Sequence, residues 1–190
     1  MKLEQTRIPG ILLLHPDLHA DERGYFYEIY KASHFSKMGL PDHFIQDNQA
    51  LSRKGVLRGL HYQLHQAQGK LVRVVEGTVF DVAVDIRKNS PTFGEWIGFE
   101  LSADNHLQVF IPEGFAHGYF VMSPTAVFQY KCTREYTPED EYGLNWNDPE
   151  LAIEWPVGNK IVSPKDSALP TLAEINKAFL PQYIENSDIQ

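Results

Sequence analysis

The stretch Gly55–Gly77 places His61 and the cationic residues Arg58 and Lys70 in a run that otherwise favours β-strands. Apolar and polar residues alternate between Leu57 and Leu64, which is typical of a strand whose two faces meet different environments. His61 lies on one face of this strand, and Lys70 opens the next strand. With an ordinary pKa of about 6.5, a histidine is often neutral at working pH and can take up a proton. The spacing therefore predicts a base and a cation that face one cavity.

Arg58 raises a geometric question in the same strand. Strict alternation puts Arg58 on the face opposite His61. The two side chains reach one ligand only if Gly59 permits a β-bulge, or if the ligand wraps around the rim of the fold. The sequence leaves both possibilities open.

The elements that must position these residues are short strands separated by Gly, Pro, Asn and Asp. This pattern predicts a mainly β protein, either a sandwich or a barrel. Helix is expected only at the edges, in Ser33–Gly39 with a serine cap and a glycine stop, and in Pro170–Leu180 at the C-terminus. The turn at 21–24 leads into an aromatic-rich strand. The predicted strands are Ile11–Leu14, Tyr25–Tyr30, Phe44–Leu51, Leu57–Leu64, Leu71–Val75, Val79–Arg87, Glu95–Leu101, Leu107–Ile111, His117–Val121 and Ala126–Thr133.

The strand Val79–Arg87 shows the clearest alternation. One of its faces is apolar throughout, whereas the other carries Asp81, Asp85 and Arg87. The apolar face is therefore predicted to be core and the other face wetter.

Length and composition limit the class of protein. With 190 residues, a single domain spanning 1–190 can bury a core without disulfides or a structural metal. The 17 Lys and Arg against 25 Asp and Glu give a net charge of −8 without any basic cluster, so a nucleic-acid partner is not expected. No apolar run is long enough to cross a bilayer, and the N-terminus is too polar for a secretory signal. We therefore expect a cytoplasmic protein with no membrane partner, and Cys132, the only cysteine, agrees with a reducing compartment.

Four motifs occur in order along the chain. Gly55, His61-x-Gln63 and Pro112-x-Gly114-x-x-His117 follow the glycine and histidine signatures of the cupins. More specific are QDNQALSRKGVLRGLHYQ at 46–63, VFQYKCTREYTPEDEYGLNWNDPELAIEWP at 127–156 and SPKD at 163–166. From about Arg7 to Pro170 the chain resembles the dTDP-4-dehydrorhamnose 3,5-epimerase family of the cupin superfamily. The resemblance implies a cupin-type double-stranded β-helix, or jelly-roll barrel, with short peripheral helices and a C-terminal helix.

The resemblance also implies a chemistry. The substrate would be dTDP-4-dehydro-6-deoxy-D-glucose, inverted at C3 and C5 to dTDP-4-dehydro-L-rhamnose in dTDP-L-rhamnose biosynthesis. Inversion beside a carbonyl removes a proton from one face of the sugar and returns one to the other. The family pattern makes His61 the base, with Asp166 fixing its tautomer. Tyr130 would return the proton, and Lys70 would stabilise the enolate oxygen at C4.

Substrate contacts follow from the same resemblance. It implies no cofactor, and a homodimer in which the partner's N-terminal strand lends part of the nucleotide site. Guanidinium forks suit a diphosphate, and an aromatic ring suits thymine. The implied contacts are Arg23, Arg58 and Lys165 for the diphosphate; Phe26, Glu28, Gln46, Asp47 and Asn48 for thymine and deoxyribose; and Lys70, His117 and Glu141 for the sugar.

Three alternatives stay open beside this hypothesis. Metal-binding cupins supply two closely spaced histidines, a glutamate and a later histidine, whereas here Gln63 replaces the second histidine and Ala67 and Gln68 occupy the place of the glutamate, so no metal is expected. A related enzyme would invert one carbon only or act as a ketoisomerase. A non-catalytic module would bind the nucleotide sugar without turnover.

Overall fold

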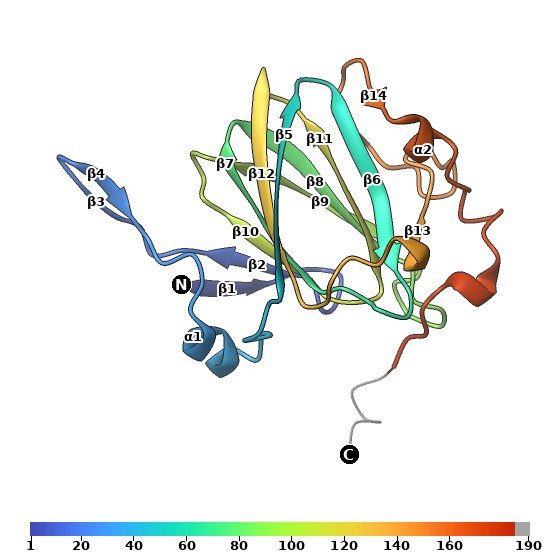
Figure 1. The fold of residues 1–190 in the computed structure, drawn as a ribbon, viewed down its shortest axis with the longest axis horizontal. Helices are drawn as coiled ribbons and strands as arrows, with labels where there is room; N and C mark the ends of the chain where they lie inside the picture. Colours follow the sequence, from blue (N-terminus) through green and yellow to red (C-terminus); the bar gives the residue numbers. More distant parts are fainter. Residues whose placement is uncertain (185–190) are drawn as a thin grey trace.

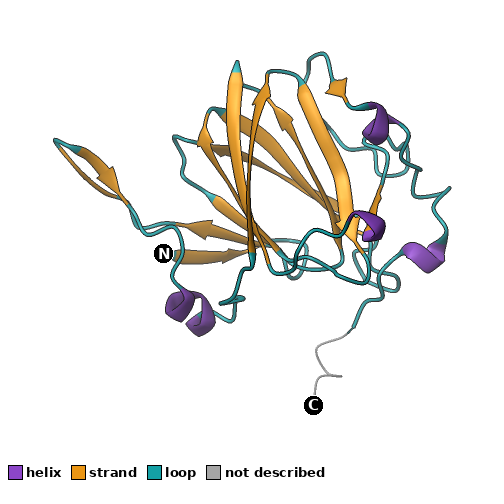
Figure 2. Ribbon diagram, in the orientation of Figure 1, coloured by secondary structure: helices purple, strands orange, loops and turns teal. Residues whose placement is uncertain are grey.

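The computed structural model describes residues 1–184, which form mainly β-strands (Figures 1 and 2). Two six-stranded sheets face each other, and from β5 to β13 the chain changes sheet at every step except between β8 and β9. This is the crossing pattern of a jelly roll, as the sequence predicts. The first sheet has the order β1 (Lys2–Gln5), β2 (Leu12–His15), β10 (Gln108–Ile111), β7 (Lys70–Glu76), β12 (Thr125–Cys132) and β5 (Gln46–Arg53). The second has the order β13 (Glu141–Gly143), β6 (Val56–Gln63), β11 (Phe115–Val121), β8 (Thr78–Asp85) and β9 (Trp96–Ser102), with β14 (Ile161–Val162) parallel to β6.

The eight strands predicted between residues 44 and 133 are confirmed, each with ends within two residues of the prediction. Glycines end the strands where tight turns require a positive φ. Gly55 has φ +85° between β5 and β6, and Gly77 has φ +75° between β7 and β8. At both positions an L side chain would be strained, which explains why glycine punctuates the pattern.

Apolar side chains form one core between the sheets and one on the outer side of each sheet. Between the sheets, Val72 and Phe128 of the first sheet share a cluster with Tyr119 of the second. Outside the second sheet, strand residues such as Val82 pack under the segment 144–180. Both faces of β8 are therefore buried, and the prediction that its Asp81 face would be wetter is wrong in that Asp81 is fully buried. The alternation in β8 therefore reflects two different buried environments, one apolar and one polar.

The N-terminal strand is shorter than predicted. The expected strand Tyr25–Tyr30 ends at Phe26, since β4 covers Gly24–Phe26 and pairs only with β3 (His19–Asp21). This two-stranded hairpin projects from the barrel at the left of Figure 1. Residues 27–30 then run across the first sheet without forming strand pairs.

The predicted N-terminal helix exists as α1 (Ala32–Lys37), but its cap was predicted incorrectly. Its N-cap is Lys31, without a side-chain cap, whereas Gly39 follows the helix with φ +72°, as expected of a glycine stop. The predicted C-terminal helix Pro170–Leu180 is wrong. That segment holds turns and a short 3-10 helix, η2 (Lys177–Phe179). The Asn176 side chain accepts the backbone N–H of Ala178, which competes with helical hydrogen bonding.

The remaining short elements are η1 (Pro138–Asp140) and α2 (Pro164–Ser167). In the described part of the chain, no helix is long and apolar enough to span a membrane. The helical turn α2 matters most for the site, because it lies beside β6 and β14 at one end of the barrel (Figure 1).

Candidate active site

His61 and Asp166 form a hydrogen-bonded pair inside the rim of the barrel. His61 Nε2 lies 2.9 Å from Asp166 Oδ1, and the backbone N–H of Gly59 donates to Asp166 Oδ2 at 3.3 Å. The Ser163 hydroxyl caps α2 by accepting the Asp166 backbone N–H at 3.0 Å, which fixes where this short turn begins. A capped turn next to β6 therefore aims a carboxylate at one nitrogen of the imidazole.

Asp166 is ionised in these surroundings. Burial raises the pKa of its carboxyl group, but the hydrogen bonds from His61, Gly59 and Ser163 outweigh burial and hold the pKa below its usual value. With Nε2 bound to this carboxylate, Nδ1 is the ring nitrogen left to face the cavity. The His61 side chain is 28% exposed, so that nitrogen is accessible to a ligand.

Lys70 and Tyr130 reach the same cavity from the opposite sheet. Lys70 opens β7 and Tyr130 lies on β12, whereas His61 lies on β6. Burial lowers the pKa of the Lys70 ammonium. Burial likewise raises the pKa of the Tyr130 phenol to about 12. The predicted base, acid and cation thus come together across the barrel.

Two cavities meet at His61, Lys70 and Tyr130. One, of about 280 Å³, is polar and includes Gln46, Asn48, Tyr136 and Glu141 in its wall. The other, of about 540 Å³, extends into the barrel and includes Arg58, His117, Lys165 and Asp166. A pocket of this size suits a small ligand.

The structure resolves the question of Arg58 and His61. Both side chains line the 540 Å³ cavity, because the β6–β11 register shifts between His117 and Tyr119. Gly59 sits at this irregularity with φ +112°, and a Cβ there would lie 2.5 Å from the Gly118 Cα atom. The bulge at Gly59, rather than a ligand wrapped around the rim, brings the arginine and the histidine to one side.

Glu141 and His117 lie on either side of the base. Glu141 Oε1 is 3.7 Å from His61 Nδ1, and its Oε2 accepts from the ammonium of Lys165. His117 is the β11 residue opposite His61, and its Nε2 lies 2.8 Å from Asp81 Oδ2. Lys165 is thus paired with Glu141 within this chain, although it also borders the larger cavity.

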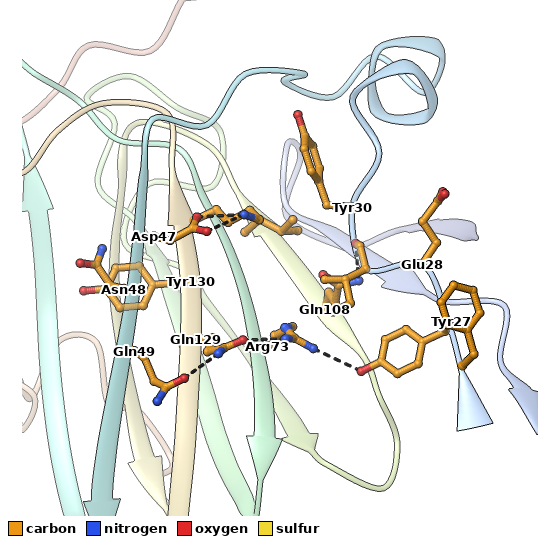
Figure 3. A pocket seen from close by; sticks show the side chains of 14 residues that line it. Tyr27, Glu28, Tyr30, Asp47, Asn48, Gln49, Arg73, Gln108, Gln129 and Tyr130 are labelled. Atoms are coloured by element: carbon orange, nitrogen blue, oxygen red, sulfur yellow. Dashed lines mark hydrogen bonds and ion pairs between the residues drawn. The ribbon is translucent and has the colours of Figure 1, made fainter. Parts of the chain in front are cut away.

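The residues predicted for the nucleotide are divided between two places. Gln46 and Asn48 line the 280 Å³ cavity beside His61, Lys70 and Tyr130. Phe26, Glu28, Asp47 and Asn48 line a neighbouring 560 Å³ pocket between the segment 26–30 and the first sheet (Figure 3). This pocket shares Asn48 and Tyr130 with the 280 Å³ cavity. Arg23 lies on the projecting hairpin, where its 85% exposed side chain pairs with Asp21. Within one chain, Arg23, Phe26 and Glu28 are not brought to His61.

Sequence reasoning missed four residues around the site. Ser52 accepts the Arg58 Nε–H at 3.2 Å, and Tyr136 donates its hydroxyl to Glu141 at 2.5 Å. Asp81 supports His117, and Arg73 bonds to Gln129 and Tyr27 in the 560 Å³ pocket (Figure 3). Asp81 carried a usable signal, since a carboxylate within an otherwise apolar strand needs a partner. The sequence around Ser52, Tyr136 and Arg73 gives no comparable signal.

The residues at the metal-binding cupin positions do not fit a metal ion. Gln63 uses its amide to donate to the carbonyls of Gln66 and Glu135 and to accept the Thr137 backbone N–H. His61 is bound to Asp166, and His117 to Asp81. Across residues 1–184, no group of three or more His, Cys, Asp or Glu side chains is arranged to hold a metal.

Fold and site together define a cupin-type barrel that carries a histidine–carboxylate pair, a buried lysine and a tyrosine around one cavity. Comparison with known proteins narrows this class. The dTDP-4-dehydrorhamnose 3,5-epimerase family profile matches residues 5–174, and the chain belongs to that family. This confirms the resemblance inferred from the motifs.

Individual relatives cover nearly the whole chain. The dTDP-4-dehydrorhamnose 3,5-epimerase of Escherichia coli (strain K12) is 52% identical over 92% of this chain and 96% of its own length. A dTDP-6-deoxy-D-glucose-3,5-epimerase from Legionella pneumophila, solved in complex with dTDP-4-keto-L-rhamnose, superposes with a TM-score of 0.94 at 50% identity, covering 97% of this chain and 99% of that one. A dTDP-4-dehydrorhamnose 3-epimerase from Streptomyces niveus is 39% identical over 96% of this chain and 90% of its own length.

Proposed function

We propose that this protein inverts C3 and C5 of dTDP-4-dehydro-6-deoxy-D-glucose and yields dTDP-4-dehydro-L-rhamnose for dTDP-L-rhamnose biosynthesis. Family membership supports the reaction class and the pathway. The observation that carries the mechanism is that His61 and Tyr130 border one cavity from opposite sheets. A sugar ring between them meets a base on one face and an acid on the other.

His61 acts as the base in this proposal. Its Nδ1 removes the proton from the carbon beside the C4 carbonyl, while Nε2–H stays on Asp166. The carboxylate orients the ring and stabilises the imidazolium that forms. Asp166 therefore acts through His61 as a positioning residue.

Lys70 and Tyr130 complete the chemistry. The Lys70 ammonium stabilises the negative charge that develops on the C4 oxygen, where a preorganised cation in a partly dry cavity has its greatest effect. Tyr130, whose pKa burial raises to about 12, stays protonated until it donates to the opposite face of the enolate. The reaction needs neither a cofactor nor a metal ion for these steps.

Substrate binding uses the wider cavity and a second copy of the chain. Arg58 and Lys165 bind the diphosphate, and His117 and Glu141 contact the sugar. We further propose that one domain of residues 1–190 forms a cytoplasmic homodimer. Exposure of the projecting hairpin supports this arrangement, because Phe26 is 71% exposed. In the dimer, the partner's hairpin brings its Arg23 to the diphosphate and its Phe26 to the thymidine end. The partner's Glu28, which follows the hairpin, joins Gln46, Asp47 and Asn48 at that end.

The replacement His61→Ala tests the base. We expect it to abolish exchange of substrate protons with deuterium from solvent, measured by NMR, while dTDP binding in calorimetry changes less than about threefold. His65→Ala is the matched control, because His65 is exposed and outside the cavities. Undiminished exchange in His61→Ala would remove His61 as the base.

A second candidate function is inversion at one carbon only. It is favoured by the similarity to the Streptomyces niveus protein, which is named for inversion at C3. NMR of the product after complete conversion separates the two functions, since the double inversion yields the L-rhamno configuration and a single inversion does not. Turnover coupled to a 4-keto reductase excludes the non-catalytic module, and product analysis identifies a ketoisomerase.

A further inference from the structure

When a base and an acid on opposite faces of the sugar carry out one inversion, both end in a protonation state that cannot start the next inversion. His61 ends each inversion as an imidazolium, and Tyr130 ends it as a phenolate. One proton must leave His61 and one must reach Tyr130 before the next inversion, whether at the second carbon or on the next substrate. This requirement rests on the proposed function.

Glu141 lies where a proton acceptor for His61 is needed. Its Oε1 is 3.7 Å from His61 Nδ1, the ring nitrogen that faces the cavity, whereas Nε2 is bound to Asp166. That gap is too short for an intervening water, and an approach of about 1 Å gives a hydrogen bond. The Glu141 side chain is only 11% exposed, so the acceptor is sheltered.

The other carboxylate oxygen leads to solvent. Glu141 Oε2 accepts the Tyr136 hydroxyl at 2.5 Å and also pairs with the Lys165 ammonium. Tyr136 is 47% exposed, and the Lys165 side chain is 60% exposed. The two oxygens of one carboxylate thus connect the partly buried imidazole with groups in contact with water.

The segment that carries Tyr136 is held in place by two glutamines. Gln46 accepts the Tyr136 backbone N–H at 2.6 Å, and Gln63 accepts the Thr137 backbone N–H at 2.8 Å. Gln63 also donates to the Glu135 carbonyl at 3.2 Å. Strands β5 and β6 therefore fix the position of the Tyr136 hydroxyl on Glu141.

We propose that Glu141 and Tyr136 form a proton exit that returns His61 to its neutral form after each inversion. The imidazolium gives its Nδ1 proton to Glu141 Oε1. The carboxyl group then rotates to bring this proton to the Tyr136 oxygen, while the Tyr136 hydroxyl turns away from Glu141, gives its own proton to water and accepts the carboxyl proton in its place. A solvent proton restores the Tyr130 phenol, so one proton leaves and one enters.

The charges around Glu141 suit this role. Burial raises the pKa of its carboxyl group, but the bonds from Lys165 and Tyr136 and the nearby imidazole hold it below the usual value. Glu141 is therefore ionised in the resting enzyme, and its lowered pKa favours passing an accepted proton on rather than keeping it. Lys70 borders the same cavity, and its positive charge acts in the same direction.

The replacement Glu141→Gln tests the exit, because glutamine keeps the shape of the side chain but cannot carry a proton. With enzyme in excess, rapid quenching in deuterium oxide should show first-carbon deuteration within about threefold of the unaltered rate. Steady-state kcat should fall about tenfold or more, and added imidazole or formate should restore it in a saturable way. Tyr136→Phe should show the same pattern with a smaller loss. Glu139→Gln, an exposed carboxylate on η1, should leave kcat unchanged.

Two results would overturn the proposal. Equal loss in the first deuteration and in kcat, without rescue by small acids and bases, would make Glu141 a substrate-orienting residue only. An unchanged kcat in both Glu141→Gln and Tyr136→Phe would show that turnover does not depend on a proton exit through these residues. Failure of the proposed function can be distinguished from failure of the proton exit, because in that case the unaltered protein would incorporate no deuterium at all. Circular dichroism checks that each variant folds.

Discussion

At the scale of single residues, the site separates three tasks that one histidine could not perform alone. His61 offers one ring nitrogen to the cavity because Asp166 occupies the other at 2.9 Å. Tyr130 stays protonated because burial raises its pKa to about 12. Lys70, on the same sheet as Tyr130, supplies positive charge close to both. The surroundings favour the protonated phenol of Tyr130 and the ionised carboxylate of Asp166, whereas burial disfavours the charged form of Lys70.

The replacement Asp166→Asn should separate orientation from binding. We expect kcat to fall by about 10- to 100-fold or more, because the amide no longer fixes the tautomer or stabilises the imidazolium. KM should change less than about threefold, since the Asp166 side chain is only 6% exposed and is bound to His61. Steady-state kinetics measures both constants, with the exposed Asp104→Asn as control. A rise in KM with unchanged kcat would contradict the positioning role.

At the scale of elements, the bulge in β6 decides which side chains share the cavity. Gly59 permits the bulge, because its φ is +112° and the place that a Cβ atom would occupy lies against the backbone of Gly118. The shift brings Arg58 and His61 to one cavity, and the Gly59 backbone N–H holds Asp166. A second element, the capped turn α2, positions the Asp166 carboxylate beside β6.

The replacement Gly59→Ala should therefore cost both stability and activity. A Cβ atom would lie 2.6 Å from the His117 carbonyl oxygen and 2.5 Å from the Gly118 Cα. We expect the free energy of unfolding to fall by about 2 to 4 kcal/mol, from the positive φ together with overpacking against backbone. Urea unfolding measures the change.

Gly24→Ala is the matched control for this prediction. Gly24 has a similar φ of +124°, but a Cβ atom there would have no neighbour within 4 Å. Its loss should be only about 1 to 2 kcal/mol. Equal losses for the two variants would show that the contact between β6 and β11 has no special importance.

At the scale of the whole molecule, the residues predicted to bind the nucleotide lie in two places within one chain. Arg23 and Phe26 lie on a hairpin that extends away from the barrel (Figure 1), whereas Gln46 and Asn48 lie at the cavity. A second copy of the chain solves this problem if its hairpin covers the first copy's cavity. Symmetric homodimers exchange such contacts in both directions.

Mixing two inactive variants tests the exchange. His61→Ala lacks the base but keeps the hairpin, and Phe26→Ala keeps the base but weakens the thymidine contact. If the hairpin acts on the partner's site, mixed dimers contain one intact site, and equilibrated mixtures should recover about a quarter of the unaltered activity at substrate below KM. If the hairpin serves its own chain, mixing restores nothing. Light scattering checks that the species are dimers.

The central strands and the C-terminal segment show which parts of the fold could be predicted from the sequence and which could not. The eight central strands follow from period-two patterns and glycine turns, which are local signals. The C-terminal helix was predicted from apolar spacing in 170–180, yet Asn176 and the flanking prolines favour turns, while Ile175 and Leu180 still pack on the core. Apolar spacing alone therefore identified buried residues without identifying their backbone conformation.

The sequence by itself determined the central strands through their periodicity, and the family, with its barrel fold, through its motifs, because both are properties of the chain alone. Only the tertiary structure decided that Arg58 joins His61, that Glu141 lies 3.7 Å from its ring, and that Tyr136 connects Glu141 to solvent. These relations join residues from different strands and loops. They depend on a bulge, a capped turn and side-chain amides acting together, and no local pattern in the sequence encodes such distances.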